Sequence, residues 1–278
     1  MLTTDDLRTF DADGFVEIGL VLDSNLIERL HERFERLFAG EFETGTAPDE
    51  VNWQLGESDP SLTRQICNAW KADRLIAATV LDERLGAAVA RLARWPGARI
   101  VQDNVIWKPP GAKSLGFHRD NAYLAWYTPS EMCSCWIALD DTSASGGTLE
   151  LARGSHRWPT SAGPQGEFHA PDDYRATVAA AAASAGAELD IAALEMSAGS
   201  AAFHHGWAWH GSGPNRSGSH RRALVLHCAS SEARLCRAGF GAGNGPVYTR
   251  YARLCDDQMD ENHFPILWHR DGYRTPGI

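Results

Sequence analysis

Residues 99–120 read RIVQDNVIWKPPGAKSLGFHRD, and this stretch separates two kinds of sequence pattern. Its first ten residues, 99–108, have the composition of a strand, and Pro109-Pro110-Gly111 ends that strand. Short strand-like segments follow, with turn-rich pieces such as SASGG and RGSHRWP between them. Short strands punctuated by glycine and proline are typical of a β-sandwich or jelly roll. The further predicted strands are 132–139, 147–151, 200–204 and 222–228.

On the N-terminal side of this stretch the sequence is predicted to be mainly helical. Apolar residues recur at helical spacing in 24–38 and again in 73–94. We therefore expect a single domain over 1–278, with a helical part at about 1–97, a jelly-roll core at about 98–236 and an irregular C-terminal tail. The segment 171–186, which contains ATVAAAAASAG, is interpreted as a surface insertion with one helix.

Composition and charge exclude several classes of protein. The chain has 278 residues, 44% hydrophobic and 22% charged, as in ordinary globular proteins, and a formal net charge of −10. With no basic cluster, nucleic acid and anionic membranes are poor candidate partners. The acidic start does not resemble a secretory signal, and no apolar run reaches the roughly 18 residues of a membrane span. The six cysteines are too sparse for a disulfide framework, and Cys133 and Cys135 are interpreted as buried thiols, so we expect a reduced, cytoplasmic protein.

The motif Phe117-His118-Arg119-Asp120 places an imidazole and a carboxylate two residues apart. In an extended segment such residues point the same way, so both can bind one metal ion. An isolated H-x-D motif is common by chance, and a surface pair is the simpler interpretation when it is considered alone.

His210, within HHGWAWHGSGPN, is the second candidate ligand. A lone histidine near tryptophans is more often a packed core residue, but here Arg221 follows eleven positions later, at the start of RRALVLHC. A guanidinium on a strand beside a metal suits the distal carboxylate of a dicarboxylate cosubstrate. The alternative for Arg221 is a solvated charge at a strand edge. In either case Arg222 must point to the opposite face.

The order of these features is more specific than any one of them. An H-x-D motif, a long gap with several strands, a histidine and then a basic residue are the layout of the 2-His-1-carboxylate facial triad. This triad leaves three iron positions open for cosubstrate and O₂. The sequence thus predicts Fe(II) bound by His118, Asp120 and His210, with 2-oxoglutarate and O₂ as cosubstrates.

The sequence resembles the phytanoyl-CoA dioxygenase family between about residues 10 and 227. The resemblance is carried by FDADGFVEIGLVLDSNLIERL, by VQDNVIWKPPGAKSLGFHRDNAYL with CWIALDDTSASGGTLELARGSHRW, and by AGSAAFHHGWAWHGSGPNRSGSHRRALVLH. It implies a double-stranded β-helix, a cupin-like jelly roll flanked by N-terminal helices. It also implies an Fe(II)- and 2-oxoglutarate-dependent dioxygenase that hydroxylates an unactivated C–H of a small-molecule metabolite and releases succinate and CO₂.

The resemblance also implies roles for individual residues. His118, Asp120 and His210 correspond to the family's iron ligands. Around them, the residues that correspond to a cosubstrate site are Arg221 with Ser212 at the distal carboxylate, Trp136 as a lining aromatic, and Gln102 and Asn104 as polar side chains facing cosubstrate or substrate.

Other residues near these motifs have weaker assignments. Gln65 lies where many family members have a lysine or arginine that reaches the cosubstrate, and Arg64 is the alternative there. Tyr123 and Trp126 follow the metal motif closely enough to be candidate walls of a substrate pocket. Of the remaining histidines near the motifs, His156 is interpreted as structural. His204 and His205 are rival ligands, but neither is followed by G-S-x-x-N or by a basic residue at the same spacing as after His210.

Two alternatives from other classes stay open on sequence grounds. A cupin-like zinc hydrolase or isomerase could use the same ligands, but it leaves Arg221 unexplained. A catalytically silent binding module is disfavoured by the intact triad. Related halogenases lack the carboxylate at the position of Asp120, so its presence favours hydroxylation, desaturation or ring formation. The family name does not make an acyl-CoA the substrate.

Overall fold

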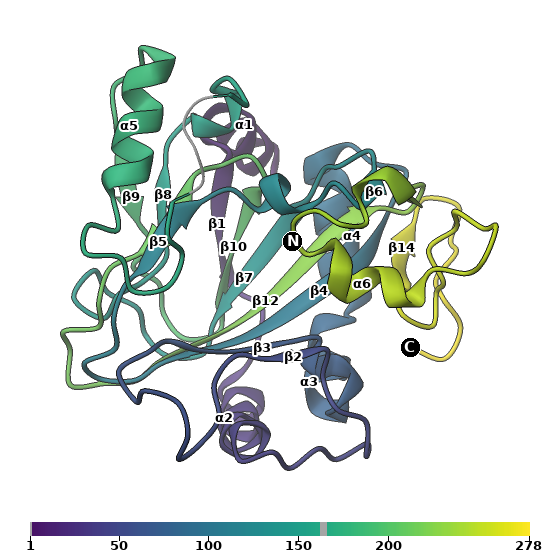
Figure 1. Ribbon diagram of the computed structural model, residues 1–278, viewed down its shortest axis with the longest axis horizontal. Coiled ribbons are helices and arrows are strands. Elements are labelled where there is room, and N and C mark those ends of the chain that lie inside the picture. The colour runs from purple at the N-terminus through teal and green to yellow at the C-terminus, as the bar shows by residue number, and fades with distance from the viewer. Residues whose placement is uncertain (1, 162–165) are drawn as a thin grey trace.

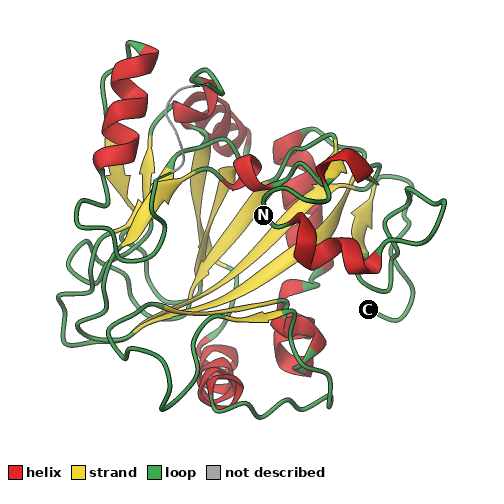
Figure 2. Cartoon of the chain, in the orientation of Figure 1, coloured by secondary structure: helices red, strands yellow, loops and turns green. Residues whose placement is uncertain are grey.

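Two facing antiparallel β-sheets form the centre of the protein in the computed structural model, which describes residues 2–161 and 166–278 (Figure 1, Figure 2). The larger sheet has eight strands in the order β1-β10-β7-β12-β4-β3-β2, with β14 pairing with β4 outside this path. The smaller sheet has the order β5-β11-β8-β9. This is the predicted double-stranded β-helix, so the predicted fold class is confirmed.

The strands of the larger sheet are β1 (Phe15–Leu20), β2 (Glu50–Val51), β3 (Arg64–Cys67), β4 (Gly97–Lys108), β7 (Cys133–Ala138), β10 (Ser200–His205), β12 (Arg221–Ser230) and β14 (Ile266–His269). Those of the smaller sheet are β5 (Leu115–His118), β8 (Glu150–Ala152), β9 (Ile191–Ala193) and β11 (His210–Ser212), and a separate pair is β6 (Tyr127–Thr128) with β13 (Arg234–Leu235). The α-helices are α1 (Thr4–Asp13), α2 (Ser24–Phe38), α3 (Arg74–Val80), α4 (Glu83–Ala93), α5 (Ala176–Ala185) and α6 (Gly245–Tyr248). The 3₁₀ turns are η1 (Ala69–Lys71), η2 (Asp120–Tyr123), η3 (Ser155–Arg157), η4 (Arg237–Gly239) and η5 (Thr249–Tyr251).

Helix α2 shows why the N-terminal region is helical. The side chain of Asp23 accepts a hydrogen bond of 2.8 Å from the main-chain N–H of Leu26, which satisfies one of the free donors at the helix start. Leu30, Phe34 and Leu37 follow at helical spacing and are all buried. Of the polar residues between them, Glu32, Glu35 and Arg36 are exposed, whereas Arg33 pairs with the buried Asp73. The helix is therefore held to the body of the protein by one apolar stripe.

The N-terminal helices pack on the outer face of the larger sheet. Apolar residues of α2, α3 and α4 form one core with the outward side chains of β4, β7, β10 and β12, including Val105, Phe203 and Leu224. In Figure 1, α4 lies behind this sheet and α2 and α3 lie below it. Cys133 and Cys135 belong to this core and are buried as free thiols.

The inner face of the larger sheet has an apolar end and a polar end. At the apolar end, Trp136 and Val225 are direct partners on β7 and β12. Two residues along the same strands, Ser134 and His227 are partners and face the same side. These buried polar residues need hydrogen-bond partners inside the protein. The polar end of the inner face is where the candidate site lies.

Helix α5 confirms the helix predicted within the alanine-rich segment. It packs on the outer face of the smaller sheet, where Val178 and Ala181 are fully buried in one cluster with Phe117 and Trp209. Figure 1 shows the helix beside β8 and β9, at the far side from the C-terminal segment. Helix α5 thus packs against the outer face of β5, the strand that carries His118.

The segments outside 98–236 contribute more to the sheets than the sequence predicted. β1, β2 and β3 precede residue 98 yet belong to the larger sheet, and β14 in the tail pairs with β4 through Ile266 and Arg99. β2 has two residues and β3 and β14 have four each, so a period of two is not recognisable in them. In the tail, Phe264 and Leu267 are fully buried. No helix within 2–161 or 166–278 is both long and apolar enough to cross a membrane.

Candidate metal centre and active-site cavity

His118 and His210 come together because two short strands of the smaller sheet are neighbours. His118 ends β5 and His210 begins β11, and the two are direct partners in the antiparallel register. Their ring centroids are 4.2 Å apart. Asp120 opens the 3₁₀ turn that follows β5, two residues beyond His118. The register of one strand pair therefore brings distant parts of the sequence to one point.

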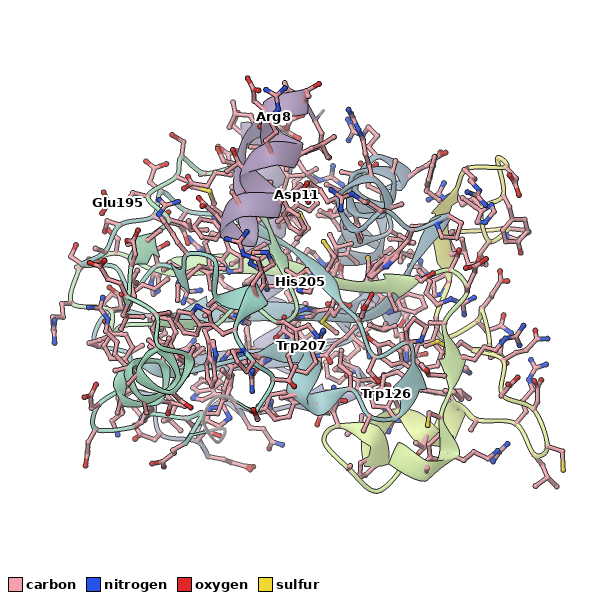
Figure 3. All side chains as sticks on the ribbon, turned by 90° about the horizontal axis from the view of Figure 1, so that it is seen from above. Arg8, Asp11, Trp126, Glu195, His205 and Trp207 are labelled. Atoms are coloured by element: carbon pink, nitrogen blue, oxygen red, sulfur yellow. The ribbon has the colours of Figure 1, made fainter. Side chains whose placement is uncertain are left out.

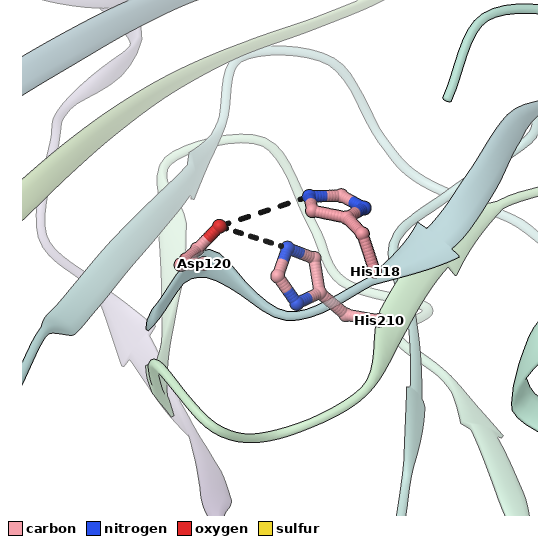
Figure 4. A group of neighbouring side chains, drawn as sticks. All are labelled: His118, Asp120 and His210. Carbon is pink, nitrogen blue, oxygen red and sulfur yellow. Dashed lines mark ion pairs between the residues drawn. The ribbon is translucent and has the colours of Figure 1, made fainter. Parts of the chain in front are cut away.

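The three side chains can hold one metal ion (Figure 4). Asp120 Oδ1 lies 3.7 Å from His118 Nε2 and 3.5 Å from His210 Nε2, and all three candidate ligand atoms lie within 4.8 Å of one another. Metal–ligand bonds of roughly 2.0–2.2 Å place adjacent ligands of one ion about 3 Å apart, so binding needs only a small contraction. In the described part of the chain, this is the one group of three or more His, Cys, Asp or Glu side chains that meets this geometry.

Main-chain carbonyls orient both imidazoles toward the ion. His118 Nδ1 lies 3.0 Å from the carbonyl oxygen of Gly116, and His210 Nδ1 lies 3.0 Å from that of Ala208. A carbonyl only accepts hydrogen bonds, so each Nδ1 carries the proton and each Nε2 keeps its lone pair for a metal. Burial lowers the pKa of both histidines, well below the usual value for His210. Both rings are therefore neutral near pH 7, which is the form that binds metals.

The two oxygens of Asp120 have separate partners. Oδ1 faces the two imidazoles, whereas Oδ2 accepts hydrogen bonds from His204 Nε2 at 3.2 Å and Ser134 Oγ at 3.1 Å. Burial opposes ionisation, but the interaction with the adjacent His210 ring and the hydrogen bond from His204 outweigh it and hold the pKa of Asp120 well below its usual range. One oxygen of an ionised carboxylate is thus left for a metal. This donor set, two nitrogens and one oxygen, fits Fe(II).

The other histidines considered from the sequence lie outside this group of three. His204 contacts Asp120 Oδ2 rather than the space between the ligand atoms. His205, the next residue on β10, faces the other side of the sheet, where its ring centroid is 5.5 Å from that of His156. His205 and His156 line a second cavity near Phe10 of α1. Figure 3 shows His205 next to α1.

The candidate metal centre opens into a cavity of about 340 Å³ between the two sheets. Pockets of this size accept small molecules rather than macromolecules. Its described lining residues are Glu50, Asn52, Thr63, Gln65, Cys67, Gln102, Asn104, Ile106, Leu115, His118, Asp120, Tyr123, Leu124, Met132, Trp136, Leu149, Phe168, His169, His204, His210, Gly211, Ser212, Arg221, Val225, His227 and Asn244.

Arg221 forms one end of this cavity. Its side chain is buried, and its Nε donates a hydrogen bond of 3.1 Å to the carbonyl oxygen of Gly147. Burial lowers the pKa of Arg221 to about 10, so it stays charged at pH 7. The guanidinium carbon lies 5.8 Å from the centre of the Trp136 ring, and Ser212 lines the same end. Arg222 points outward, where it pairs with Asp140 at 2.7 Å.

Lys108 adds a second buried cation behind Ser212. Its ammonium donates hydrogen bonds to Ser212 Oγ at 2.7 Å and to the carbonyl oxygen of Gly213 at 2.5 Å. Lys108 is the direct partner of Arg221 on the neighbouring strand, so the two share one face. Burial and the charge of Arg221 hold the pKa of Lys108 well below its usual value. The hydroxyl of Ser212 is thereby fixed, with its own proton free to point into the cavity.

A line of polar side chains runs from Asp120 across the floor of the cavity. Asn104 Nδ2 lies 3.0 Å from His227 Nε2, and His227 Nδ1 lies 2.7 Å from Ser134 Oγ, which in turn donates to Asp120. Gln102 joins the line through a 2.7 Å bond to Asn104 Oδ1. Burial lowers the pKa of His227 to about 4. The polar side chains that lead from Gln102 to Asp120 are therefore uncharged near pH 7, and Asp120 itself carries the charge.

The remaining predicted residues divide between the cavity and the core. Gln65 lines the cavity, whereas Arg64 lies on the other face of β3, with its guanidinium 4.1 Å above the ring of Trp53. Tyr123 lines the cavity beside His118.

The structure does not bring Trp126 to the cavity wall. Its ring is buried and stacks on Tyr248 at 5.1 Å, beside the C-terminal segment (Figure 3). Trp126 Nε1 donates a hydrogen bond of 2.6 Å to Asn244 Oδ1, and Asn244 lines the cavity in its place. Proximity to the metal motif in sequence misplaced this residue, because the chain turns away from the cavity after η2.

Some site residues were not predicted, although the alternation of strands contained a signal for them. Ser134 lies two positions before Trp136, and Lys108 lies four positions after Asn104, so each shares a face with a predicted residue. His227 shares the inner face with Val225. Its partnership with Ser134 depends on strand register, which one sequence does not reveal.

The model of the phytanoyl-CoA dioxygenase family matches residues 10–223. This range is more than half of the chain and includes the three candidate metal ligands and Arg221. The chain belongs to the phytanoyl-CoA dioxygenase family. Residues 224–278, with the C-terminal part of β12 and all that follows, lie beyond the match.

Individual members of the family and its fold are similar to the chain over most of its length. The human peroxisomal phytanoyl-CoA dioxygenase is 24% identical over 249 residues, which are 84% of this chain and 70% of that protein. The dioxygenase olcK of Penicillium canescens is 30% identical over 232 residues, 80% of this chain and 69% of that protein. A solved structure of the epimerase SnoN with Fe³⁺, alpha-ketoglutarate and nogalamycin RO has a TM-score of 0.72 at 18% identity, covering 95% of this chain and 98% of that one.

This member of the phytanoyl-CoA dioxygenase family is an Fe(II)- and 2-oxoglutarate-dependent dioxygenase. The predicted enzyme class and the predicted iron and 2-oxoglutarate are confirmed. The zinc hydrolase and the silent binding module are set aside. The likeness to SnoN concerns the fold, and the identity of this enzyme's substrate is a separate question.

Proposed function

We propose that this enzyme hydroxylates a C–H bond of a small-molecule metabolite, with its iron held by His118, Asp120 and His210. The observation that carries the proposal is the division of atoms among these three side chains. Each has one ligand atom facing the common point, and the other polar atom of each is already hydrogen-bonded. Bound iron, with 2-oxoglutarate and O₂, supplies the oxidising power that breaks the C–H bond, and succinate and CO₂ are the coproducts.

The cosubstrate is proposed to lie between the iron ligands and Arg221. Arg221 holds its distal carboxylate through charge-assisted hydrogen bonds, and Ser212 donates a further bond. Two observations support these roles. Arg221 has no carboxylate partner among the described residues, and Lys108 donates to Ser212 Oγ, so the hydroxyl proton of Ser212 is left to donate elsewhere. Trp136 closes this end against water.

The outcome of the oxidation is proposed to be hydroxylation, which is what the family resemblance implies. Asp120 argues against halogenation, because its carboxylate fills the position that a halide would need. Gln65, which also lines the cavity, is proposed to face the cosubstrate. The substrate is proposed to bind beside Gln102, Asn104 and Tyr123. These side chains exclude bulk water and orient the reacting C–H, on which catalysis depends at the level of about 1 Å.

The whole of 1–278 is proposed to act as one domain in the cytoplasm. Strands from both ends of the chain belong to the larger sheet, which supports a single unit. The six cysteines are free, four of them buried, which supports a reducing compartment.

The iron assignment is tested with purified metal-free protein. Addition of Fe(II) and 2-oxoglutarate without O₂ should produce a weak visible charge-transfer band, and His118→Ala and His210→Ala should each abolish it. His205→Ala is the matched control, because His205 is a histidine of the adjoining region that faces the other side of the sheet, and its band should keep full strength. A full-strength band in the His118 and His210 variants would overturn the ligand assignment.

A further inference from the structure

Among the described residues, five carboxamide side chains line the cavity. Asn52, Gln65, Gln102, Asn104 and Asn244 all line it. They come from four separate segments of the chain: the loop after β2, strand β3, strand β4 and the residue that precedes α6. Three of these side chains, Gln102, Asn104 and Asn244, are joined by hydrogen bonds although they come from β4 and from the segment before α6. We call these three residues the carboxamide wall.

This wall carries no positive charge. Among the described residues that line the cavity, Arg221 is the one lysine or arginine, and it lies at the cosubstrate end. Near the carboxamide wall, Glu50 faces the cavity, and the neighbouring cations Lys71 and Arg250 are bound by Asp49 at 2.7 Å and 2.5 Å. Phosphate and carboxylate ligands need charge-assisted donors. A substrate with phosphate groups, such as a CoA thioester, has no partner here.

The carboxamides form a chain with unused hydrogen-bonding capacity. Asn244 Nδ2 donates to Gln102 Oε1 at 3.4 Å, and Gln102 Nε2 donates to Asn104 Oδ1 at 2.7 Å. Each amide has two N–H groups and an oxygen with two lone pairs, so a lone pair remains on all three oxygens and one N–H remains on Asn104 and on Asn244. The second N–H of Gln102 contacts Cys67 Sγ at 3.5 Å. A hydroxyl group both donates and accepts. Closely spaced amides therefore suit a molecule that carries several hydroxyl or carbonyl groups.

Aromatic side chains line the same space next to the metal ligands. Phe168 packs edge-on against His118 with ring centroids 4.7 Å apart, and Tyr123 lies on another side of that ring at 6.4 Å. Both line the cavity. Aromatic side chains present flat apolar surfaces to a ring. A ring bound in this space can pack against Phe168 and Tyr123 while its polar groups reach the amides.

We propose that the substrate is an uncharged, hydroxyl-rich ring compound, such as a glycoside or a polyhydroxylated polycycle, whose polar edge is bound by Gln102, Asn104 and Asn244. This proposal rests on the proposed function of the site. Asn244 lies beyond the family match, which ends at residue 223, and it is held in place by Trp126. Asn244 is therefore the specificity residue that the C-terminal segment adds to the family's site.

The first test measures succinate formation with two sets of probes. One set is uncharged, a panel of aryl glycosides and polyhydroxylated polycycles, and the other is anionic, decanoyl-CoA and decanoate. Stimulation of succinate formation over the substrate-free rate by members of the uncharged set alone supports the proposal. Stimulation by the anionic set, or by neither set, overturns it. Failure of the proposed function gives a different result: both the anaerobic charge-transfer band and the substrate-free formation of succinate would then be absent.

The second test measures the contribution of Asn244 with the best stimulating probe. Loss of one or two uncharged hydrogen bonds should raise the KM for the probe by roughly 3- to 30-fold in Asn244→Leu, with a smaller change in kcat. Asn244→Asp keeps the acceptor for Trp126 and adds a negative charge, and for an uncharged ligand its KM should rise by a similar factor.

The matched control is Asn262→Leu, an exposed carboxamide of the same C-terminal segment that bonds to Asp260. Its KM and kcat should equal those of the wild type. The proposal is overturned if Asn244→Leu leaves the KM unchanged, or if Asn244→Asp raises it at least tenfold more than Asn244→Leu, because the latter indicates an anionic ligand. Thermal unfolding of each variant distinguishes a local effect from loss of the fold.

Discussion

At the scale of single residues, the site depends on hydrogen bonds that already engage one polar atom of each candidate metal ligand. Oδ2 of Asp120 and Nδ1 of both ligand histidines have partners within the protein, so Oδ1 and two Nε2 atoms are left facing one point. Pre-arranged ligands lose little freedom when a metal binds, and hydrogen bonds to their far atoms fix their orientation. The same logic applies to Ser212, whose hydroxyl direction is set by Lys108.

Removal of the Arg221 guanidinium should weaken cosubstrate binding selectively. A charge-assisted pair in a buried site contributes roughly 2–4 kcal/mol, so Arg221→Ala should raise the KM for 2-oxoglutarate by about 30- to 1,000-fold. Affinity for Fe(II) should change little. Arg222→Ala is the control, because Arg222 points outward to Asp140, and its KM should stay at the wild-type value. Steady-state kinetics decide the matter, and an unchanged KM in Arg221→Ala would move the role to another residue.

Stability of the metal-free protein should fall as the pH drops from about 6.5 toward 4. Burial lowers the pKa of His118 and His210 and lowers that of His227 to about 4, whereas an unfolded histidine titrates near 6.5. Within this window the unfolded chain binds protons that the folded chain does not, and each such histidine costs up to about 1.4 kcal/mol per pH unit. Above pH 6.5 the full stability is present.

Urea unfolding at pH 7.5, 6.0 and 5.0 measures this loss. His227→Gln removes one of the titrating groups, so the free energy of unfolding of this variant should depend less steeply on pH than that of the wild type. Equal free energies of unfolding for the wild type at pH 7.5 and 5.0 would contradict the expectation that these histidines are buried and neutral.

At the scale of elements, long patterns were predictable and short ones were not. The apolar stripe of α2 contains several helical periods, and the ten residues 99–108 that form most of β4 have a strand-like composition, so both were recognised. β5 has four residues and β11 three, too few for a pattern, although they carry His118 and His210. The metal ligands were instead predicted from chemical motifs and their order. What no motif contains is register, which decides which inward residues meet Asp120.

Helix α2 should contribute strongly to stability through one side chain. Phe34 is fully buried between the helix and the larger sheet, and replacing such a residue with alanine leaves a cavity. Phe34→Ala should lower the free energy of unfolding by about 3–5 kcal/mol. Glu35→Ala, at the next and exposed position, should change it by less than about 0.5 kcal/mol. Denaturant unfolding of both variants tests this, and similar values for the two would contradict the packing described.

At the scale of the whole molecule, the C-terminal segment is part of the core and not an appendage. Tyr248, Phe264 and Leu267 are all fully buried, and β14 extends the larger sheet. The same segment brings Asn244 to the cavity and Tyr251 to a buried cluster with Asp49 and Lys71. The sequence left this tail without a role, because its apolar residues are spaced irregularly and its helix and strand have four residues each.

A chain that ends at Cys236 should therefore fail to fold. It lacks three large buried side chains, and loss of each should lower the free energy of unfolding by about 3–5 kcal/mol. The combined loss is comparable to the whole free energy of unfolding of a domain, roughly 5–15 kcal/mol. Soluble yield and a cooperative thermal transition should both be lost. Leu254→Ser, in the same segment at a position that is 90% exposed, should leave the transition unchanged. A truncated chain with a wild-type transition would show that the segment is dispensable.

The direct pairing of His118 with His210 has a consequence for how this enzyme can diversify. The distance between the two imidazoles is set by one hydrogen-bonded strand pair, and the length of chain that joins them does not enter into it. Loops between the two histidines can grow, shrink or be exchanged while the iron site keeps its shape, since a loop's closure cost rises only slowly with its length. Phe168 and Tyr123 both lie in that intervening stretch, and both face the cavity. Inheritance of the oxidising chemistry and acquisition of new substrates can therefore proceed independently, and grafting of these loops is the natural route to redesigning the enzyme.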